Sequence, residues 1–429
     1  QDYSLEMGVS RFVKEGALEN YVSCVKQLTS KPVVSVGRFT SPDTMVKQVN
    51  AGVLDFIGAA RPSIADPFLP KKIEEGRLED IRECIGCNIC YMGDGTGTPI
   101  RCTQNPTMSE EWRRGWHPEI IKSRKYDSQV LIVGAGPAGL EAAHQLGKRG
   151  YSVTLAEATR NLGGRVTKEA KLPGLSEWIR VRDYRVQQLQ KLDNVEIFLE
   201  SELSAKDVID FGADHIAVAT GCYWRKDGFG INNLGGISNL CPANKIYSPD
   251  DIMAGSFPEG STIIFDDDHY YMGTVMAEIM RMRKIPVKLI TPADVISEWG
   301  EYTYDRWRAQ KTLMAMGVEL ETGHNLSCFD GSKATIRCGY SGREKIIDAE
   351  ALIMLTARIP NDNLYSNILE ALRSNIDYRP ISLKRIGDCE APAIIAAAVY
   401  SGHKYARELE EKINLDNPLR YDRVFAEES

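Results

Sequence analysis

The segment "VLIVGAGPAGLEAA" constrains the fold of this 429-residue chain more than any other stretch. It places Gly134, Gly136 and Gly139 in a G-x-G-x-x-G pattern after an apolar run, and Glu157 follows near the end of the next apolar run. Glycines at this spacing let the backbone approach a pyrophosphate at a helix N-terminus, and an acidic side chain can then bind ribose hydroxyls. We therefore predict a Rossmann-like dinucleotide-binding unit, in preference to a role in packing alone.

Two other stretches repeat this strand–helix–strand pattern. The apolar runs "KPVVSVGRF" and "GVLDFIGAARPS" flank the helix-like "SPDTMVKQVNAG", with Ser41 as the expected N-cap. A weaker copy, "STIIFDDDHYYMGTVMAEIMRMRKIPVKLIT", begins at Ser261. Such alternation predicts an α/β chain built on parallel sheets.

A cysteine-rich segment, "ECIGCNICYMGDGTGTPIRCTQNP", lies between the first two of these units. Cys84, Cys87 and Cys90 follow a C-x2-C-x2-C spacing, and Cys102 lies twelve residues further on. Three thiols at this spacing suit three corners of a [4Fe–4S] cluster, and a fourth can return from a loop. Structural zinc is the weaker alternative, because zinc sites favour two separated C-x2-C pairs or cysteine–histidine mixtures. The other cysteines are isolated, and we interpret them as small apolar core residues.

Charge and hydropathy exclude two classes of partner. The net charge of −7 comes from interspersed acidic and basic residues, so no basic field is available for nucleic acid. No apolar run reaches the roughly 18 residues of a membrane span, and the first residues lack the features of a signal peptide. We expect a cytoplasmic protein that contacts neither membrane nor nucleic acid.

Two more motifs indicate a flavoprotein reductase with two dinucleotide-type domains. "HIAVATG" ends a predicted strand at Thr220 and Gly221, and "RIGDCEAP" supplies Gly387 and Asp388. The weaker third unit, however, has three aspartates, 266–268, where a nicotinamide fingerprint would need glycines. Because carboxylates repel a pyrophosphate, we predict that this third unit binds no NAD(P)H.

The order of the motifs "CIGCNIC", "CTQNPT", "EEWRRGWHPE", "VGAGPAG", "LPGLSEW", "ATG" and "IGDCEAP" resembles the trimethylamine dehydrogenase family of iron–sulfur flavoproteins, which includes histamine and dimethylamine dehydrogenases. The resemblance implies an N-terminal (β/α)₈ barrel that binds FMN, a [4Fe–4S] segment, and two Rossmann-like domains of the reductase kind, of which one holds ADP, or alternatively FAD. The related 2,4-dienoyl-CoA reductases share this layout, but their cysteine spacing differs and they keep a nicotinamide fingerprint.

The resemblance also predicts domain boundaries. Residues 1–82 correspond to the C-terminal part of the barrel, residues 83–126 to the cluster segment and linker, residues 127–245 plus 372–429 to the ADP- or FAD-binding domain, and residues 246–371 to an inserted, degenerate NAD(P)-binding-like domain. Only two barrel strands are predicted, and two strands cannot close a barrel. We therefore expect either a fragment or a chain that works as a homodimer or with a partner chain that supplies the missing strands.

Half of a flavin phosphate clamp is expected in this remnant. In such barrels the loops after the last two strands bind a cofactor phosphate, which here indicates Gly37 with Arg38 and Ala60 with Arg61. A surface role for either arginine is the alternative interpretation.

The resemblance implies oxidation of a small amine to an iminium by FMN, with electrons leaving singly through the cluster to an electron-transfer flavoprotein. Asp94, in "YMGDGTG", matches the position where histamine dehydrogenase has an aspartate that can pair with an ammonium group. The alternative is that Asp94 only shapes an Asp-Gly turn. Two other functions remain open: an NAD(P)H-dependent 2,4-dienoyl-CoA or enoate reductase, and a noncatalytic electron-transfer subunit.

Overall fold

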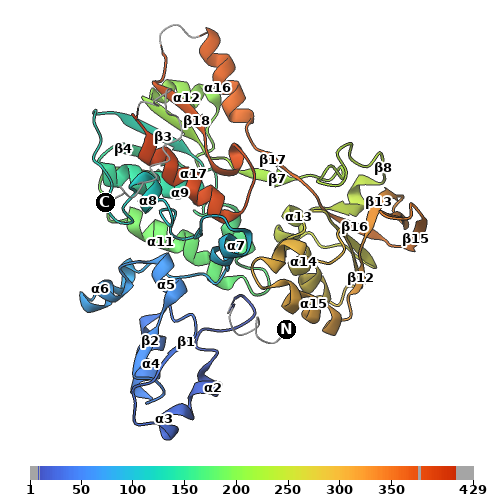
Figure 1. The fold of residues 1–429 in the computed structure, drawn as a ribbon. Helices are drawn as coiled ribbons and strands as arrows, with labels where there is room; N and C mark the ends of the chain where they lie inside the picture. Colours follow the sequence, from blue (N-terminus) through green and yellow to red (C-terminus); the bar gives the residue numbers. More distant parts are fainter. Residues whose placement is uncertain (1–7, 9, 375–377, 412–429) are drawn as a thin grey trace, which may run out of the picture. The chain divides into compact units, whose positions relative to one another are not determined.

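The computed structural model describes residue 8, residues 10–374 and residues 378–411 (Figure 1). Its described residues divide into two compact units. Unit 1 comprises residue 8, residues 168–176 and residues 222–359; unit 2 comprises residues 10–167, 177–221, 360–374 and 378–411. Unit 1 thus includes residues 168–176 and 222–245, which the predicted boundaries placed in the ADP- or FAD-binding domain.

Unit 2 is built on a five-stranded parallel sheet in the order β18-β6-β3-β4-β5. The strands are β3 (Gln129–Val133), β4 (Ser152–Ala156), β5 (Val195–Phe198), β6 (His215–Val218) and β18 (Ser382–Arg385). Val130 and Ile132 of β3 pack into one core, whereas Leu131 and Val133 pack into another. Both faces of the sheet are therefore covered, as expected for parallel strands rich in β-branched residues.

Helices cover these two faces separately. One core includes residues of α9 (Pro137–Arg149), α11 (Arg180–Leu189) and α17 (Ile395–Glu408), and the other includes residues of α12 (Ala205–Phe211) and α16 (Asn363–Ser374). The predicted strand, turn, helix and strand around Gly134 are confirmed as β3, α9 and β4.

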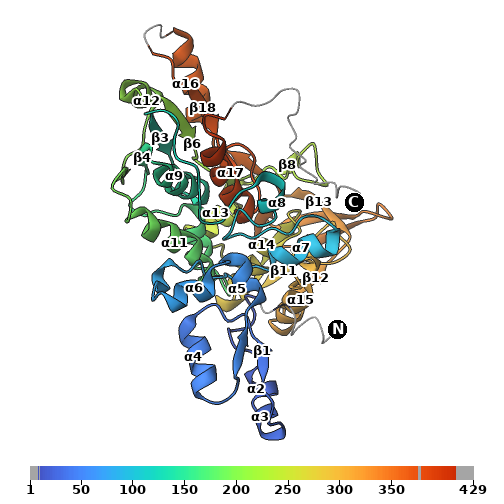
Figure 2. The same cartoon turned by 60° about the vertical axis from the view of Figure 1, so that its left-hand side comes forward.

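The N-terminal part of unit 2 contains a small parallel sheet of two strands, β1 (Val34–Val36) and β2 (Phe56–Gly58), joined by α4 (Pro42–Asn50) (Figure 2). Ser41 is the N-cap of α4, as predicted, although its side chain makes no capping hydrogen bond. The apolar side chains of Val34, Val36 and Phe56 are 63%, 51% and 61% exposed. Parallel sheets are normally covered on both faces, so this small sheet lacks part of its usual covering.

Shorter helices complete unit 2. They are α2 (Glu19–Val22), α3 (Val25–Leu28), α5 (Ala60–Ala65), α6 (Leu69–Glu74), α7 (Ile89–Thr96) and α8 (Glu111–Arg114), with 3₁₀ turns η1 (Leu78–Asp80) and η5 (Gly387–Cys389). Two more elements, α10 (Arg165–Glu169) and η2 (Ser176–Ile179), lie where the chain passes between the units.

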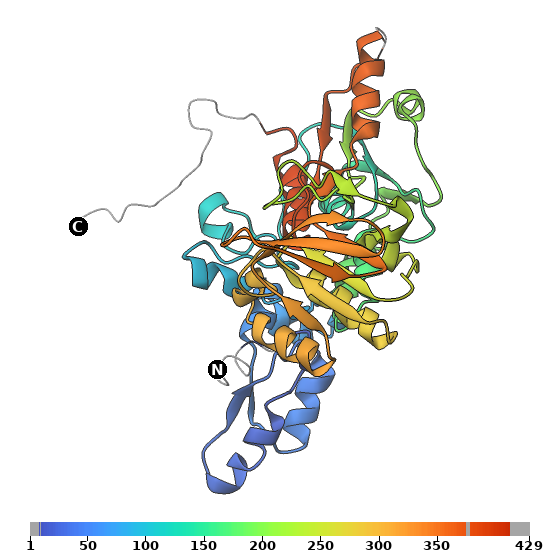
Figure 3. The ribbon, with the colours of Figure 1, turned by 90° about the vertical axis from the view of Figure 1, so that its right-hand side faces the viewer.

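Unit 1 has a second parallel sheet in the order β12-β11-β10-β16-β9 (Figure 3). It also has a mixed sheet in the order β15-β14-β13-β8, in which β13, β14 and β15 are antiparallel and β8 pairs with β13 in parallel. The parallel strands are β9 (Ile246–Tyr247), β10 (Thr262–Asp266), β11 (Val287–Ile290), β12 (Glu319–Glu321) and β16 (Ala351–Leu355). The mixed sheet comprises β8 (Asn239–Leu240), β13 (His324–Phe329), β14 (Lys333–Cys338) and β15 (Glu344–Asp348). The predicted third strand–helix–strand copy is confirmed as β10, α14 (Tyr271–Met282) and β11.

The remaining elements of this unit are short. They are α13 (Pro249–Met253), α15 (Arg306–Ala315), η3 (Ala243–Lys245), η4 (Glu298–Glu301) and the strand pair β7 (Cys222–Trp224) with β17 (Arg358–Pro360). Among the helices in the described residues of the chain, none is long and apolar enough to cross a bilayer.

Candidate cofactor sites

The cysteine loop brings the four predicted thiols together in unit 2. Cys84 and Cys87 precede α7, Cys90 lies in its first turn, and Cys102 lies in the loop that follows. Burial raises the pKa of Cys102 to about 12, and the nearby charges of Cys87 and Cys84 add to this effect. Burial, and then the charges of the other three cysteines, raises the pKa of Cys90 as well. The thiols are therefore close enough to interact electrostatically, and at Cys90 and Cys102 the neutral thiol is favoured until a cation binds.

The donor set suits a polynuclear cluster. Within the described parts of the chain, no group of three or more His, Cys, Asp and Glu side chains is arranged to bind a metal ion. A cube of four irons needs its thiolates at separate corners, so the cysteines need not converge on one point as the ligands of zinc do. Bound iron would deprotonate the thiols and offset the cost of burying their charges.

A buried hydrogen-bond network fixes the ends of this loop. Arg185, which is fully buried, donates to Gln104 Oε1 at 3.0 Å and to Glu141 Oε2 at 2.7 Å. Gln104 Nε2 donates to the carbonyl of Glu83 at 3.0 Å, next to Cys84. The network therefore joins both ends of the cysteine loop to α9. Sequence patterns did not reveal it, because polar residues so far apart carry no local signal.

The dinucleotide turn has the geometry that the glycine pattern predicted. Gly134 has a φ of +106°, and a Cβ at Gly139 would lie 1.9 Å from the Gly134 carbonyl oxygen, so these two glycines are required for packing. A Cβ at Gly136, by contrast, would meet nothing within 4 Å, so Gly136 leaves open space at the N-terminus of α9. Glu157 accepts hydrogen bonds from the N–H groups of Ala135 and Thr159, both at 2.9 Å. Open space beside the first N–H groups of a helix suits a phosphate.

The other predicted nucleotide residues lie at the same edge of the sheet. Thr220 and Gly221 follow β6, and Gly387 and Asp388 follow β18, just as Gly134 follows β3. The Gly387 N–H donates to Ser401 Oγ at 2.9 Å, and Asp388 Oδ1 accepts from the N–H of Ala393 at 3.2 Å. Ligands of open α/β sheets bind outside the carboxyl ends of the strands, which is where these residues meet.

The two predicted clamp arginines lie against the cysteine loop. Arg38 is 4% exposed, donates to Glu177 Oε1 at 3.0 Å, and has its guanidinium 3.0 Å from where a Cβ on Gly86 would be. Arg61 donates to Asn88 Oδ1 at 2.5 Å. Gly37, next to Arg38, directly follows β1, and Ala60, next to Arg61, is the first residue of α5. Binding of a flavin phosphate by these four residues remains a prediction.

Asp94 lies within α7 and is exposed. Both Asp94 and Gly95 are helical. Asp94 and Gly95 therefore form part of a helix and not an isolated turn, and whether Asp94 binds substrate or has only a structural role stays a prediction.

In unit 1 the aspartates after β10 bind the protein's own backbone. Asp267 accepts from the Asn232 N–H at 3.0 Å and from Asn232 Nδ2 at 2.7 Å, and a Cβ on Gly230 would lie 2.2 Å from Asp267 Oδ2. The chain around 230–232 thus packs against the carboxylate that replaces the fingerprint glycines. Asp266 is fully buried, and its Oδ2 has no hydrogen-bond partner among the described residues. A phosphate at this position would therefore meet carboxylates, which repel it, in place of the free N–H groups that could bind it.

Asp266 should make the stability of unit 1 depend on pH. Burial, and then the charge of Asp268, raises the pKa of Asp266 from 3.8 to about 7. The folded state therefore retains a proton that the unfolded chain loses, so the free energy of unfolding falls as pH rises from about 4 to about 7. At pH 8 the free energy of unfolding of Asp266→Asn should exceed that of the parent by roughly 2 to 4 kcal/mol, so the variant should unfold at a higher urea concentration. At pH 4 the variant and the parent should unfold at similar urea concentrations. Urea titrations at both pH values would test this, with Asp348→Asn, a change at an exposed position, as control. The prediction is refuted if the free energy of unfolding changes equally with pH in the parent and in both variants.

Comparisons with known proteins agree with this arrangement. Residues 8–80 match the NADH:flavin oxidoreductase / NADH oxidase family, and residues 132–199 match an NAD(P)-binding Rossmann-like domain. Dimethylamine dehydrogenase of Hyphomicrobium sp. (strain x) is 36% identical over 96% of this chain and 59% of its own length. The structure of histamine dehydrogenase from Rhizobium sp. 4-9 superposes with a TM-score of 0.94 at 48% identity, covering 98% of this chain and 62% of that one. The chain belongs to the trimethylamine and histamine dehydrogenase family.

A third relative supports the assignment. The 6-hydroxypseudooxynicotine amine oxidase of Pseudomonas geniculata N1 superposes with a TM-score of 0.92 at 44% identity, over 95% of this chain and 61% of that one. The chain thus spans about three fifths of the length of the relatives it matches. The family predicted from the motifs is confirmed, as is an α/β fold with an FMN-oxidoreductase segment and a Rossmann-like domain.

Proposed function

We propose that this chain is the cluster- and nucleotide-binding part of an iron–sulfur flavoprotein that oxidatively deaminates or demethylates a small amine. The observation that carries the proposal is the joining of the half-buried cysteine loop to the dinucleotide helix α9 through Gln104, Arg185 and Glu141. The amine dehydrogenases and the amine oxidase among its relatives support the class of substrate.

The four cysteines would hold the [4Fe–4S] cluster, which supplies one-electron transfer when bound. Arg38 and Arg61 bring positive charge to the cysteine loop, and in the proposal they also face the FMN phosphate together with Gly37 and Ala60. Gly136 and the start of α9 would hold the pyrophosphate of ADP, while Glu157 would bind its ribose. Electrons would then leave toward an external acceptor such as an electron-transfer flavoprotein.

In this proposal, the other strands of the flavin barrel would come from further sequence or from a partner chain. The exposed Val34, Val36 and Phe56 of β1 and β2 would be covered by the missing strands, supplied by further sequence of the same protein or by a partner chain. Native mass determination distinguishes these cases. A monomer of this mass, lacking flavin, would favour the noncatalytic electron-transfer subunit.

Reduction by nicotinamides separates the proposal from a 2,4-dienoyl-CoA reductase. The flavin-containing protein should be bleached anaerobically by its amine, but not by NADH or NADPH, because Asp267 and the chain around Asn232 leave no phosphate-binding turn after β10. Denaturation should release ADP. Rapid bleaching by either nicotinamide nucleotide would instead favour the reductase.

Asp94 is our proposed recognition residue for the substrate ammonium. Its carboxylate on α7 is exposed and therefore accessible to a cation, and in this proposal the other barrel strands would enclose the bound amine. Asp94→Asn should raise KM about ten- to a hundredfold for a primary amine such as histamine, as expected for a lost charge-assisted hydrogen bond. Glu111→Gln, on α8, is the matched control. If the Asp94 variant keeps the parent's kinetics with every amine that the enzyme oxidises, Asp94 does not bind the substrate.

A further inference from the structure

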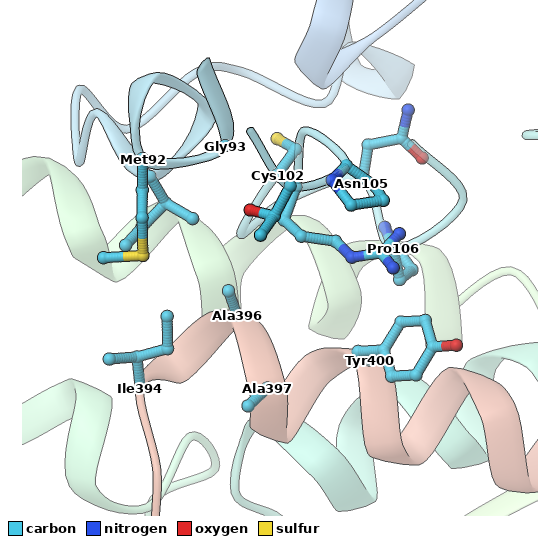
Figure 4. Close-up of a pocket in the computed structure, with 13 residues that line it drawn as sticks. Met92, Gly93, Cys102, Asn105, Pro106, Ile394, Ala396, Ala397 and Tyr400 are labelled. Carbon is cyan, nitrogen blue, oxygen red and sulfur yellow. The ribbon is translucent and has the colours of Figure 1, made fainter. Parts of the chain in front are cut away.

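A cavity of about 260 Å³ lies in unit 2 between the cysteine loop and the start of α17. Figure 4 shows the loop on one side and α17 on the other, with Met92 and Ile394 at one end and Pro106 and Tyr400 at the other. Ala396 and Ala397 form the wall contributed by α17, and these small side chains leave a space between the two elements. The opposing walls are largely apolar, which suits a flat hydrophobic ring.

One wall of this cavity contains a proposed cluster ligand. Cys102 lines the cavity, and its sulfur points away from α17 in Figure 4. A molecule in the cavity would thus be separated from the cluster by little more than one cysteine side chain. This position is suited to a redox partner rather than to a structural ligand.

The cavity is polar at the end formed by Arg101 and Tyr400. The Arg101 guanidinium lies 5.6 Å from the centre of the Tyr400 ring and 2.7 Å from the carboxylate of Glu110. Glu110 is fully buried and also pairs with Arg113 and Arg114, and Arg114 pairs with Glu408 as well, so three guanidinium groups share two carboxylates. The excess positive charge would favour a ligand oxygen that gains negative charge on reduction.

We propose that this cavity binds a small planar quinone, of the size of a naphthoquinone, that accepts electrons from the cluster. This inference rests on the proposed function. Oxidation of R–CH₂–NH₃⁺ to R–CH=NH₂⁺ releases two electrons and two protons. The quinone takes up two electrons, one at a time, and two protons from water, and leaves as the hydroquinone. The apolar walls hold the ring, and Arg101 faces one carbonyl oxygen.

The test uses the purified chain, dithionite-reduced after its iron content has been measured. With 1,4-naphthoquinone, the rate of cluster reoxidation should saturate with quinone concentration. Ala397→Phe, which places a ring in the cavity, should lower that rate at least about tenfold at subsaturating quinone. Ile394→Trp should do the same. Lys404→Phe, on the exposed face of α17, is the matched control and should keep the parent rate. Reoxidation by ferricyanide should be alike in all four proteins.

The outcomes separate the two proposals. Absence of iron would refute the proposed function, and naphthoquinone binding would then be measured by calorimetry on the iron-free chain and its Ala397→Phe variant. Equal quinone reoxidation rates in the parent and both cavity variants, or equal binding by calorimetry, would overturn the quinone site.

Discussion

A Cys87→Ser variant of this chain should be purified without its iron–sulfur cluster. Cys87 is half-buried beside Thr103, with Sγ 3.2 Å from the Thr103 hydroxyl, and it interacts electrostatically with the other three thiols. A hydroxyl is a poor replacement for a thiolate on iron, so iron and sulfide should fall from about four of each per chain to nearly none. In the flavin-containing protein, amine should still reduce the flavin, but transfer to an external acceptor should fall by about a hundredfold or more.

The matched control is Cys241→Ser, which replaces an exposed thiol in unit 1. It should retain the iron and sulfide of the parent. Iron and sulfide assays on the three proteins check the prediction, and a Cys87→Ser protein with the parent's iron content would contradict it.

A Gly136→Val variant should lose the adenine nucleotide without losing the fold. The backbone of Gly136 is extended, and a side chain there would enter open space at the N-terminus of α9, where the pyrophosphate is proposed to bind. Affinity for ADP should weaken at least about a hundredfold, which corresponds to about 3 kcal/mol. Calorimetric titration with ADP measures this loss.

Two other glycines provide the controls. Gly139→Ala should fail to fold properly, because its Cβ would meet the carbonyl oxygen of Gly134. Gly235→Val, in unit 1, places the same side chain in open space away from the dinucleotide turn, and should bind ADP like the parent. A Gly136→Val protein with the parent's affinity for ADP would show that the nucleotide does not bind at this turn.

Local patterns in the sequence predicted the parts of the fold that depend on local chemistry. The glycines around Gly134 require one strand–turn–helix geometry, and a continuous apolar run such as Val130–Leu131 suits a strand that packs into a core on each face of its sheet. The spacing of Cys84, Cys87 and Cys90 likewise predicted that these three thiols lie near one another, because so few residues separate them.

Contacts between distant residues could not be predicted in this way. The bonds that join Gln104, Arg185 and Glu141 link three separate segments, and each residue alone is an ordinary polar side chain. The placement of Arg38 and Arg61 against the cysteine loop depends equally on tertiary packing. At Asp94, a local Asp-Gly preference for turns was overridden by the continuation of α7.

The most direct test of the account is the metal and sulfide content of the chain itself, purified without oxygen. We predict about four irons and four acid-labile sulfides per chain, bound by Cys84, Cys87, Cys90 and Cys102. A chain that contained stoichiometric zinc and no sulfide would contradict the account, because a zinc site cannot carry the electrons of an amine oxidation.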